Sequence, residues 1–378
     1  MKKIKVLQVN KLYPPVIGGI EKFVQQLSES LNSEVAIKVL VCQERGREKD
    51  EIIHGVNVHR CTTLGVFLSM PISFSFLKQF INESKKNDIV TIHMPFPLAD
   101  LALLLSRYKG HVVLWWHSDI VRQKKLLFFL RPLLTRTIKR ADTIVVATKG
   151  HIMYSEFIKN YEEKCVIIPF SVNPKTMSCA DKYLKMKKSG FEKDKFCFLF
   201  VGRLVYYKGC DILLRAFAKA NLSKATLTIV GDGPLKKELI ELVKNLNLAS
   251  KVLFKNKVTD AQLYEEYEKS DVLVLPSVEK SEAFGLVQIE AMAFAKPVIN
   301  TRLNSGVPYV GIDGVTGLTV NPKDIDELCQ AMIKLYDNPE YTRTLGKNAR
   351  KHVLNNYDSK IITAKIVELY NNINGGKK

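Results

Sequence analysis

Short apolar runs of strand length alternate with amphipathic stretches of helix length along most of this 378-residue chain. In the first half, the apolar runs cover residues 4–9, 35–41, 88–93, 112–116, 143–147 and 166–169. Strands that alternate with helices are typical of parallel βαβ units. The pattern therefore predicts a doubly wound parallel sheet, and ligands bind such sheets outside the carboxyl ends of the strands.

The same alternation begins again further along the chain. The second series of apolar runs covers residues 196–201, 225–230, 252–254, 271–275, 296–300 and 317–320. A chain of this length is too long for one ordinary core, so we expect two domains. The predicted fold class is α/β, with two doubly wound, Rossmann-like parallel sheets that face a central cleft.

We place the first domain at residues 1–170 and the second at residues 171–355. The remaining residues, 356–378, are expected to form a C-terminal helix that packs back on the first domain. The last few residues are polar and should fray.

The formal net charge of +19 is spread over both halves of the chain. It indicates acidic partners: nucleotide phosphates, lipid diphosphates, an anionic membrane surface or nucleic acid. Nucleic acid is the weakest of these, because no reading helix or aromatic RNA platform is recognisable and the basic residues do not form one stripe.

Seven scattered cysteines without a C-x-x-C pair argue against a zinc site and against a disulfide framework. They fit a reducing compartment. No apolar run approaches the roughly 18 residues of a membrane-spanning helix. We therefore expect a cytoplasmic protein, either soluble or peripheral on the inner face of the membrane.

Residues 281–290 concentrate chemistry at the end of an apolar, strand-like run. Glu282 falls in a loop, Gly285 allows a sharp turn, and Glu290 falls one turn into the helix that follows. The free amides at a helix start form an anion site. Two carboxylates beside such a site suit a ligand with hydroxyls at both ends and phosphates between, as in a nucleotide sugar. The alternative is an ordinary helix start, which favours acids in any case.

Other polar groups and glycines stand at predicted strand ends in both halves. The carboxyl ends of parallel strands meet at one edge of a sheet, so we expect these groups to converge on a ligand. They are Gly18, Gly19, Glu21, His93, His117, Arg203, Lys208 and Gly231.

Taken together, these motifs resemble the retaining glycosyltransferases of family 4, which have the two-domain GT-B fold. The resemblance covers nearly the whole chain and rests on Pro-Pro-x-x-Gly-Gly-Ile-Glu at 14–21, Gly-Arg-Leu at 202–204 with Lys-Gly at 208–209, Val-Gly-Asp-Gly-Pro at 230–234, and Glu-Ala-Phe-Gly at 282–285 with Glu290. The segments at 93–97, 116–121 and 276–285 further resemble a bacterial branch that contains mannosyl- and rhamnosyltransferases of cell-surface polysaccharide assembly.

The resemblance implies roles for residues of the donor site. Arg203 and Lys208 would stabilise the departing diphosphate, the first with a forked guanidinium and the second with a point charge. Glu290 would hold the ribose hydroxyls, and Glu282 would bind a hydroxyl of the transferred sugar. The remaining predicted contacts with the donor come from Gly18, Gly19, Gly231, Phe284, Gly285 and Leu286.

The resemblance also places His117 near the donor sugar, with a catalytic role beside Glu282, Arg203 and Lys208. The alternative is that Ser118 or Asp119 caps a helix and His117 only lies alongside. His93 and Glu21 would line the acceptor side, or else serve the structure alone.

No metal or other cofactor is expected. The one D-x-D pattern, Asp324-Ile325-Asp326, opens a predicted helix, and capping explains it better than Mg²⁺ binding. No His/Cys cluster and no Walker or G-x-G-x-x-G loop is present in the sequence, so hydride and phosphoryl transfer are not expected.

Residues 122–140 carry seven basic side chains and no acid, interleaved with leucine and phenylalanine. Such a basic amphipathic helix can lie on an anionic membrane. The alternative is an ordinary domain helix with a basic outer face.

The expected activity is a retaining, metal-independent transfer of a hexose, mannose from GDP-mannose. The acceptor would be a polyprenyl-diphosphate-linked or other growing glycan of the O-antigen, capsule or exopolysaccharide type. Other donors, UDP-GlcNAc, UDP-glucose or a deoxyhexose nucleotide, remain open, and so does a GT-B epimerase of a nucleotide sugar.

Overall fold

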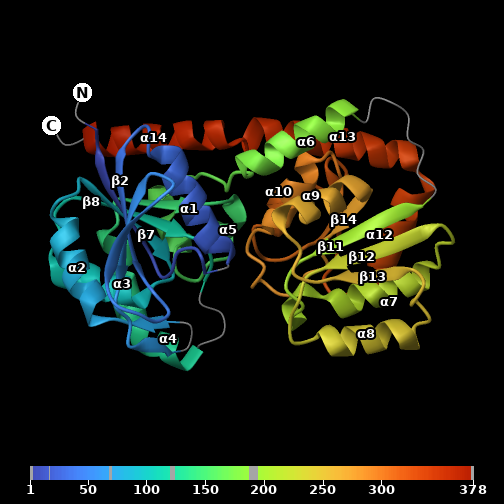
Figure 1. The fold of residues 1–378 in the computed structure, drawn as a ribbon, viewed down its shortest axis with the longest axis horizontal. Helices are drawn as coiled ribbons and strands as arrows, with labels where there is room; N and C mark the ends of the chain where they lie inside the picture. Colours follow the sequence, from blue (N-terminus) through green and yellow to red (C-terminus); the bar gives the residue numbers. More distant parts are fainter. Residues whose placement is uncertain (1–2, 17, 68–69, 120–123, 187–194, 376–378) are drawn as a thin grey trace. The chain divides into compact units, whose positions relative to one another are not determined.

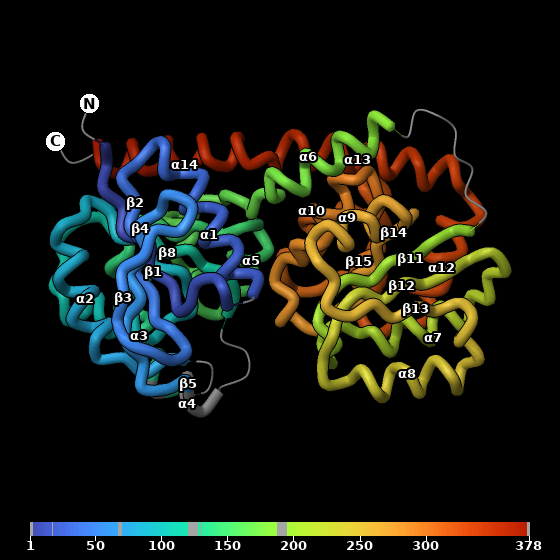
Figure 2. The backbone as a smooth tube through the Cα atoms, viewed as in Figure 1, coloured from blue at the N-terminus to red at the C-terminus, as the bar shows by residue number. Residues whose placement is uncertain are grey.

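A computed structural model describes residues 3–16, 18–67, 70–119, 124–186 and 195–375 (Figures 1 and 2). The chain divides into two compact units. Unit 1 comprises Met1–Phe170 and Lys360–Lys378, and unit 2 comprises Ser171–Ser359. We describe each unit by itself.

Unit 1 is built on a sheet whose strands run β10-β9-β8-β7-β1-β2-β4-β3. Neighbouring strands are parallel, apart from β3, which pairs antiparallel with β4. The strands are β1 (Lys5–Asn10), β2 (Ala36–Cys42), β3 (Lys49–Ile53), β4 (Val56–Cys61), β7 (Ile89–Met94), β8 (His111–Trp116), β9 (Thr143–Val146) and β10 (Cys165–Ile167). The two short strands β5 (Gly65–Phe67) and β6 (Met70–Ile72) pair separately.

The strand order of unit 1 reverses between β1 and β7. From β1 the chain proceeds through β2 and β4 toward one edge, and from β7 through β8, β9 and β10 toward the other. The loops that leave β1 and β7 therefore lead to opposite sides of the sheet, and ligands of such sheets bind at this point, outside the carboxyl ends of the strands.

Helices cover both faces of the unit 1 sheet, and Figure 1 shows α2 on one side with α1 and α5 on the other. Leu7 and Val9 of β1 join α2, α3 and α4 in one apolar cluster, whereas Gln8 points to the opposite face because side chains alternate along a strand. The helices are α1 (Gly19–Leu31), α2 (Phe74–Ser84), α3 (Pro97–Ser106), α4 (Lys124–Arg140), α5 (Lys149–Met153), the 3₁₀ turn η1 (Lys159–Lys164) and α14 (Ser359–Gly375).

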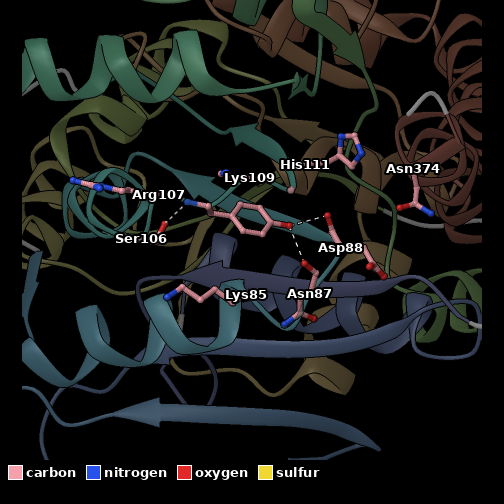
Figure 3. Close-up of a pocket in the computed structure, with 10 residues that line it drawn as sticks. Lys85, Asn87, Asp88, Ser106, Arg107, Lys109, His111 and Asn374 are labelled. Carbon is pink, nitrogen blue, oxygen red and sulfur yellow. Dashed lines mark hydrogen bonds between the residues drawn. The ribbon is translucent and has the colours of Figure 1, made fainter. Parts of the chain in front are cut away.

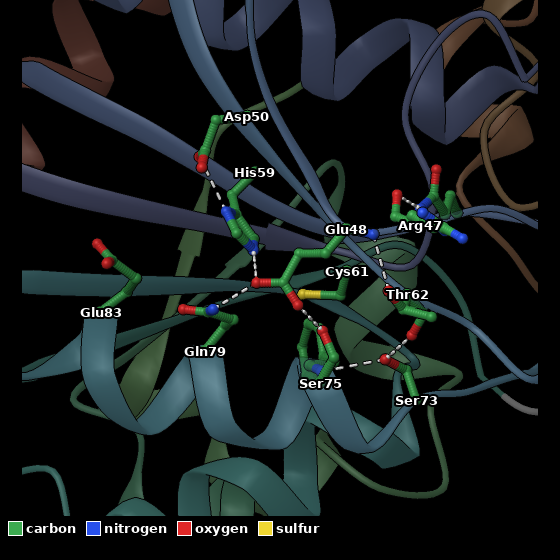
Figure 4. Close-up of polar contacts among 12 residues, drawn as sticks. Arg47, Glu48, Asp50, His59, Cys61, Thr62, Ser73, Ser75, Gln79 and Glu83 are labelled. Carbon is green, nitrogen blue, oxygen red and sulfur yellow. Dashed lines mark hydrogen bonds and ion pairs between the residues drawn. The ribbon is translucent and has the colours of Figure 1, made fainter.

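A polar network ties the β3–β4 hairpin to α2 (Figure 4). His59 Nδ1 lies 2.8 Å from Asp50 Oδ1, and His59 Nε2 lies 3.1 Å from Glu48 Oε1. Ser75 and Gln79 of α2 donate hydrogen bonds to the Glu48 carboxylate, and the bond from Ser75 lowers the pKa of Glu48. The network holds the edge of the sheet.

Unit 2 contains a parallel sheet in the order β13-β12-β11-β14-β15-β16. Numbered within the unit, this is the order 3-2-1-4-5-6 of dinucleotide-binding folds, and it reverses between β11 and β14. The strands are β11 (Phe196–Val201), β12 (Ala225–Val230), β13 (Val252–Lys255), β14 (Val272–Val274), β15 (Val298–Thr301) and β16 (Gly317–Val320).

The helices of unit 2 bury apolar faces against this sheet. The Asp324 side chain accepts hydrogen bonds from the amides of Asp326 and Glu327, so the D-x-D pattern caps α12, as the sequence predicted. The helices are α6 (Pro174–Met186), the 3₁₀ turn η2 (Tyr206–Lys208), α7 (Cys210–Ala220), α8 (Lys236–Asn245), α9 (Asp260–Lys269), α10 (Leu286–Ala293), α11 (Val307–Val310), α12 (Ile325–Asp337) and α13 (Pro339–Asn356).

The predicted fold class is confirmed, since both units are doubly wound parallel sheets. The apolar runs of the sequence do not predict β3, β4, β5 and β6, because β3 and β4 are rich in polar residues and β5 and β6 have 3 residues each. Tyr357 and Asp358 separate α13 from α14.

Candidate functional site

The loops that leave β11 and β14 meet at the point where the strand order of unit 2 reverses. Lys208, in the first loop, forms an ion pair through Nζ with Glu282 Oε2, in the second. Both side chains are nearly buried, with 12% and 10% exposed. Ser277 Oγ donates to the same carboxylate oxygen at 3.1 Å. Lys208, which the resemblance assigns to the diphosphate, and Glu282, which it assigns to the sugar, are thus direct partners.

Glycine allows these loops to approach one another. Gly209 has φ +65°, and a Cβ at this position would lie 2.1 Å from the carbonyl oxygen of Pro276. Gly231 follows β12, where a Cβ would lie 1.9 Å from the carbonyl oxygen of Gly202. A side chain at either position would force the loops apart.

The helix start predicted at Gly285 is present. Gly285 has φ +74° and precedes α10, and a Cβ there would lie 2.6 Å from Leu275 Cδ2. Leu286 is therefore the first residue of α10, and its end of the helix presents backbone amides. The Phe284 side chain is buried against Tyr357, so this residue can offer a ligand only its backbone.

Glu290 lies on α10, one turn beyond the helix start, and is held by a residue that the sequence analysis did not select. The hydroxyl of the fully buried Tyr267 donates to Glu290 Oε2 at 2.6 Å. Burial raises the pKa of Tyr267 well above its usual value, and the negative charge of Glu290 adds to that shift. The tyrosine therefore stays a donor and fixes one oxygen of the carboxylate.

Arg203 stands in the loop after β11, and its side chain is exposed. Together, Arg203, the Lys208–Glu282 pair and the start of α10 give unit 2 positive and hydrogen-bonding groups at the carboxyl ends of β11 and β14. This arrangement suits a ligand that carries both phosphates and hydroxyls.

In unit 1, the loop after β1 contains Gly18, the residue before α1, and Gly19, its first residue. A Cβ at Gly18 would lie 2.0 Å from Glu21 Oε2, so the Glu21 carboxylate covers this end of the helix. Burial raises the pKa of Glu21, and the charge of Lys11 opposes that shift. The Glu21 carboxylate thus occupies the start of α1, where the resemblance predicts a phosphate.

His117 directly follows β8, is 4% exposed, and forms a hydrogen bond with His93 of β7 (2.9 Å between His117 Nε2 and His93 Nδ1). His93 Nε2 lies 2.9 Å from Gln8 Oε1, so both ring nitrogens of His93 have partners inside unit 1. Burial lowers the pKa of His117 to about 3, with further lowering by the charges of His151 and Lys11. Burial also lowers the pKa of His93 well below its usual value.

The sequence left open that Ser118 or Asp119 caps a helix and that His117 only lies alongside. Asp119 accepts hydrogen bonds from Trp116 Nε1, from Ser155 Oγ and from the backbone amide of Glu156. Asp119 therefore ties the loop after β8 to the segment after α5. These hydrogen bonds do not involve the His117 side chain.

A cavity of about 620 Å³ lies elsewhere in unit 1 (Figure 3). Lys85, Arg107, Lys109 and Tyr108 contribute to its lining, at the amino ends of β7 and β8. The Tyr108 hydroxyl donates to backbone carbonyls of the β7 entry. Because ligands of such sheets bind at the carboxyl ends, this cavity is not the candidate site.

The predicted basic segment falls partly outside the described residues. Residues 120–123 are not described, and neither are the side chains of 124–127 and 129, so only the later part of the basic segment 122–140 is seen, within α4. Among the described residues, no group of three or more His, Cys, Asp or Glu side chains is arranged to hold a metal ion. Within the same part of the chain, no helix is long and apolar enough to cross a membrane.

The fold and the unit 2 site define a class of protein: an α/β protein with two Rossmann-like units, one of which has the strand order of nucleotide-binding folds and a helix start that can bind phosphate where that order reverses. Comparison with known proteins narrows the class. The family profile described as Glycosyl transferases group 1 matches residues 181–352, and that of Glycosyltransferase Family 4 matches residues 17–175.

Individual proteins match over nearly the whole chain. The O-antigen chain mannosyltransferase C of Escherichia coli is 32% identical over 352 residues, 92% of this chain and 93% of that protein. D-rhamnosyltransferase WbpZ of Pseudomonas aeruginosa is 33% identical over 353 residues, 92% of this chain and 90% of that protein. The solved sucrose-phosphate synthase of Thermosynechococcus elongatus matches with a TM-score of 0.80 at 22% identity, covering 99% of this chain and 100% of the other.

The chain belongs to the family 4 glycosyltransferases and has the GT-B fold. It is a glycosyltransferase, as the sequence predicted. Other site neighbours escaped the sequence analysis: Ser277 beside Glu282, Tyr267 behind Glu290, Lys11 near Glu21, and Gln8 behind His93. Lys11 and Ser277 each lie two residues beyond a predicted strand, which is a signal that could have identified them, whereas Tyr267 and Gln8 carried none.

We predict that the buried histidines of unit 1 make it sensitive to acid. Burial lowers the pKa of His151 to about 4, and a free histidine has a pKa near 6.5. The stability from a neutral His151 is therefore complete above about pH 6.5 and is lost as the pH falls toward 4. Between pH 6.5 and 5 this histidine alone should cost about 1.5 kcal/mol of unfolding free energy.

Urea unfolding at several pH values measures this effect. Trp115 and Trp116, the only tryptophans of the chain, lie in unit 1 and report its unfolding by fluorescence. A His151→Gln variant should lose stability less steeply between pH 6.5 and 5, whereas His54→Gln, at an exposed site, should follow the wild type. Equal slopes for His151→Gln and wild type would show that His151 is not buried neutral.

Proposed function

We propose that this glycosyltransferase moves a hexose, mannose from GDP-mannose, with retention of configuration, onto a lipid-linked or growing cell-surface glycan. The observation that carries the proposal is the match along nearly the full length to an O-antigen chain mannosyltransferase and to a D-rhamnosyltransferase. Mannose and rhamnose share a ring configuration in the D-series and differ at C6, which supports a donor of the manno type.

Unit 2 supplies the groups that we assign to the donor. Arg203 and Lys208 would stabilise the charge that grows on the departing diphosphate, and fixed donors of this kind contribute on the order of 2–4 kcal/mol to catalysis. Glu290, fixed by Tyr267, would use its second oxygen for a ribose hydroxyl. Glu282 would accept a hydrogen bond from a hydroxyl of the sugar. The reaction we propose needs no bound metal, since the side chains and helix start supply the positive charge.

The Lys208–Glu282 pair supports this assignment because it compensates charge at a nearly buried position. A carboxylate paired in this way accepts from a neutral hydroxyl without carrying an unpaired charge into the dry site. The ammonium keeps two further N–H donors for a phosphate oxygen. One pair can thus serve both the sugar and the leaving group.

For unit 1, we propose on the resemblance alone that His117 contacts the donor sugar and that Gly18 and Gly19 offer amides to the diphosphate. The latter requires that a phosphate displaces the Glu21 carboxylate from the start of α1. Such a carboxylate would then be free to turn toward the acceptor side.

A thermal-shift panel with GDP, UDP, ADP and their sugars tests the donor. A nucleotide at about 100 times its dissociation constant should add roughly 2.7 kcal/mol of stability. We expect GDP to stabilise the protein and UDP and ADP to have little effect. Glu290→Gln should abolish most of the shift, whereas Glu265→Gln, exposed on α9, should retain it. Stabilisation by UDP and not GDP would contradict the GDP-mannose assignment, and no shift with any nucleotide would contradict the donor site.

We also propose that α4 docks on the anionic inner face of the membrane, where a polyprenyl-diphosphate-linked acceptor would be found. Arg131 and Arg136 are exposed on this helix, and Phe128 is 76% exposed. Basic residues near an anionic surface each contribute about 1 kcal/mol.

Co-sedimentation with anionic liposomes at low salt measures this docking. We expect the wild type to bind and the Arg131→Ser/Arg136→Ser variant to bind several-fold less. Lys237→Ser/Lys244→Ser, at exposed positions on α8 of unit 2, is the control and should bind like the wild type. Failure of the wild type to sediment would contradict membrane docking.

A further inference from the structure

A row of polar side chains crosses three adjacent strands of unit 1 on the face opposite its main apolar cluster. Gln8 lies on β1, Thr91 and His93 on β7, and His117 at the end of β8, and all are at most 4% exposed. Alternation along the strands places them on one face, because Leu7, Ile92 and Trp116 point into the cluster on the other. Tyr370 of α14, which is fully buried, completes the row.

Hydrogen bonds connect the row from end to end. Tyr370 Oη lies 3.5 Å from Gln8 Nε2 and 3.3 Å from Thr91 Oγ1. Gln8 Oε1 lies 2.9 Å from His93 Nε2, and His93 Nδ1 lies 2.9 Å from His117 Nε2. The two imidazole planes differ by 4° with centroids 5.2 Å apart, so the rings lie edge to edge and the last bond lies in both planes.

The chemistry of the amide fixes where the protons are. Gln8 Nε2 can only donate, and it donates to Tyr370, so Oε1 faces His93 and can only accept. His93 Nε2 must then carry a hydrogen. A neutral imidazole has one N–H, so His93 Nδ1 is an acceptor and His117 Nε2 must donate to it. His117 Nδ1 is left without a hydrogen.

Burial keeps both rings neutral, since it lowers the pKa of His117 to about 3 and that of His93 well below its usual range. Among the described residues, none forms a hydrogen bond with His117 Nδ1. In this tautomer the nitrogen can therefore accept a hydrogen bond from a ligand.

We propose that Tyr370 is a positioning residue: through Gln8 and His93 it holds His117 in the Nε2–H tautomer, which presents Nδ1 as an acceptor for a sugar hydroxyl. The last part of this proposal rests on the proposed function of His117. In the opposite tautomer His117 would present an N–H donor at Nδ1, and a sugar hydroxyl could then act only as the acceptor. The C-terminal helix thus sets the hydrogen-bonding character of a residue far from it in sequence.

The tautomer is measured directly by ¹⁵N NMR of histidine-labelled protein without ligand, with His117→Gln to assign the signal. We expect His117 of the wild type to be protonated at Nε2 and bare at Nδ1. A wild-type His117 protonated at Nδ1, or an even mixture of both forms, would overturn the proposal. This result does not depend on the substrate or on the activity.

Tyr370→Phe removes the acceptor of the Gln8 amide, so the amide can turn and His117 should become a mixture of tautomers. Thr91→Val is a milder change that removes the other partner of the Tyr370 hydroxyl. The hydroxyl can then donate to Gln8, which should shift the tautomers in the same direction. Tyr108→Phe is the control, because this buried tyrosine of unit 1 donates only to backbone carbonyls of 87 and 88 and should leave His117 unchanged. An unchanged His117 in both Tyr370→Phe and Thr91→Val would overturn the proposal.

Kinetics separates this proposal from the proposed function. With Tyr370→Phe the KM for the nucleotide sugar should rise about threefold to tenfold, with the affinity for the free nucleotide unchanged. If the tautomer changes as expected and the KM does not, the role of His117 at the sugar is wrong, while its control by Tyr370 stands. If the KM rises while the tautomer stays fixed, Tyr370 acts by packing and the control of His117 is overturned.

Discussion

Each sheet of this protein reverses its strand order at one point, between β1 and β7 in unit 1 and between β11 and β14 in unit 2. At such a point the two outgoing strands connect to helices on opposite faces of the sheet, so side chains just beyond the strands are not covered by a crossover helix. The polar groups of each unit gather there: Lys11, His93 and His117 in the first, and Lys208 and Glu282 in the second. Most other residues of the strands are apolar, because parallel strands are buried on both faces.

At the points where the strand order reverses, the two units reduce the energetic cost of burying polar groups in different ways. Unit 2 pairs opposite charges, Lys208 with Glu282, and adds a neutral donor from Ser277. Unit 1 keeps its imidazoles neutral and links them by hydrogen bonds to an amide and a phenol. The first arrangement suits a ligand that carries phosphates and hydroxyls, and the second suits a ligand with hydroxyls.

The sequence was sufficient for the fold class, because strand periodicity is a local signal. The motifs after the strands also placed Lys208, Glu282 and Glu290 at the strand ends and the helix start where the structure has them. The residues that hold these side chains in place could not be predicted from the sequence. Tyr267 lies on α9 and Tyr370 at the end of the chain, and each has the sequence character of an ordinary core residue. Their hydrogen bonds to Glu290 and Gln8 exist only through tertiary packing. The pairing of Lys208 with Glu282 was missed for the same reason, since each was considered within its own loop.

The central claim is that Lys208 and Glu282 act as one unit at the donor. A double-mutant cycle on kcat/KM for the nucleotide sugar, with Lys208→Met, Glu282→Gln and the double variant, tests it most directly. If the pair acts as a unit, the double variant should be little worse than the poorer single variant, with a coupling energy of about 1–3 kcal/mol. Losses that add to within about 0.3–0.5 kcal/mol would show that the two side chains act independently and would contradict the account.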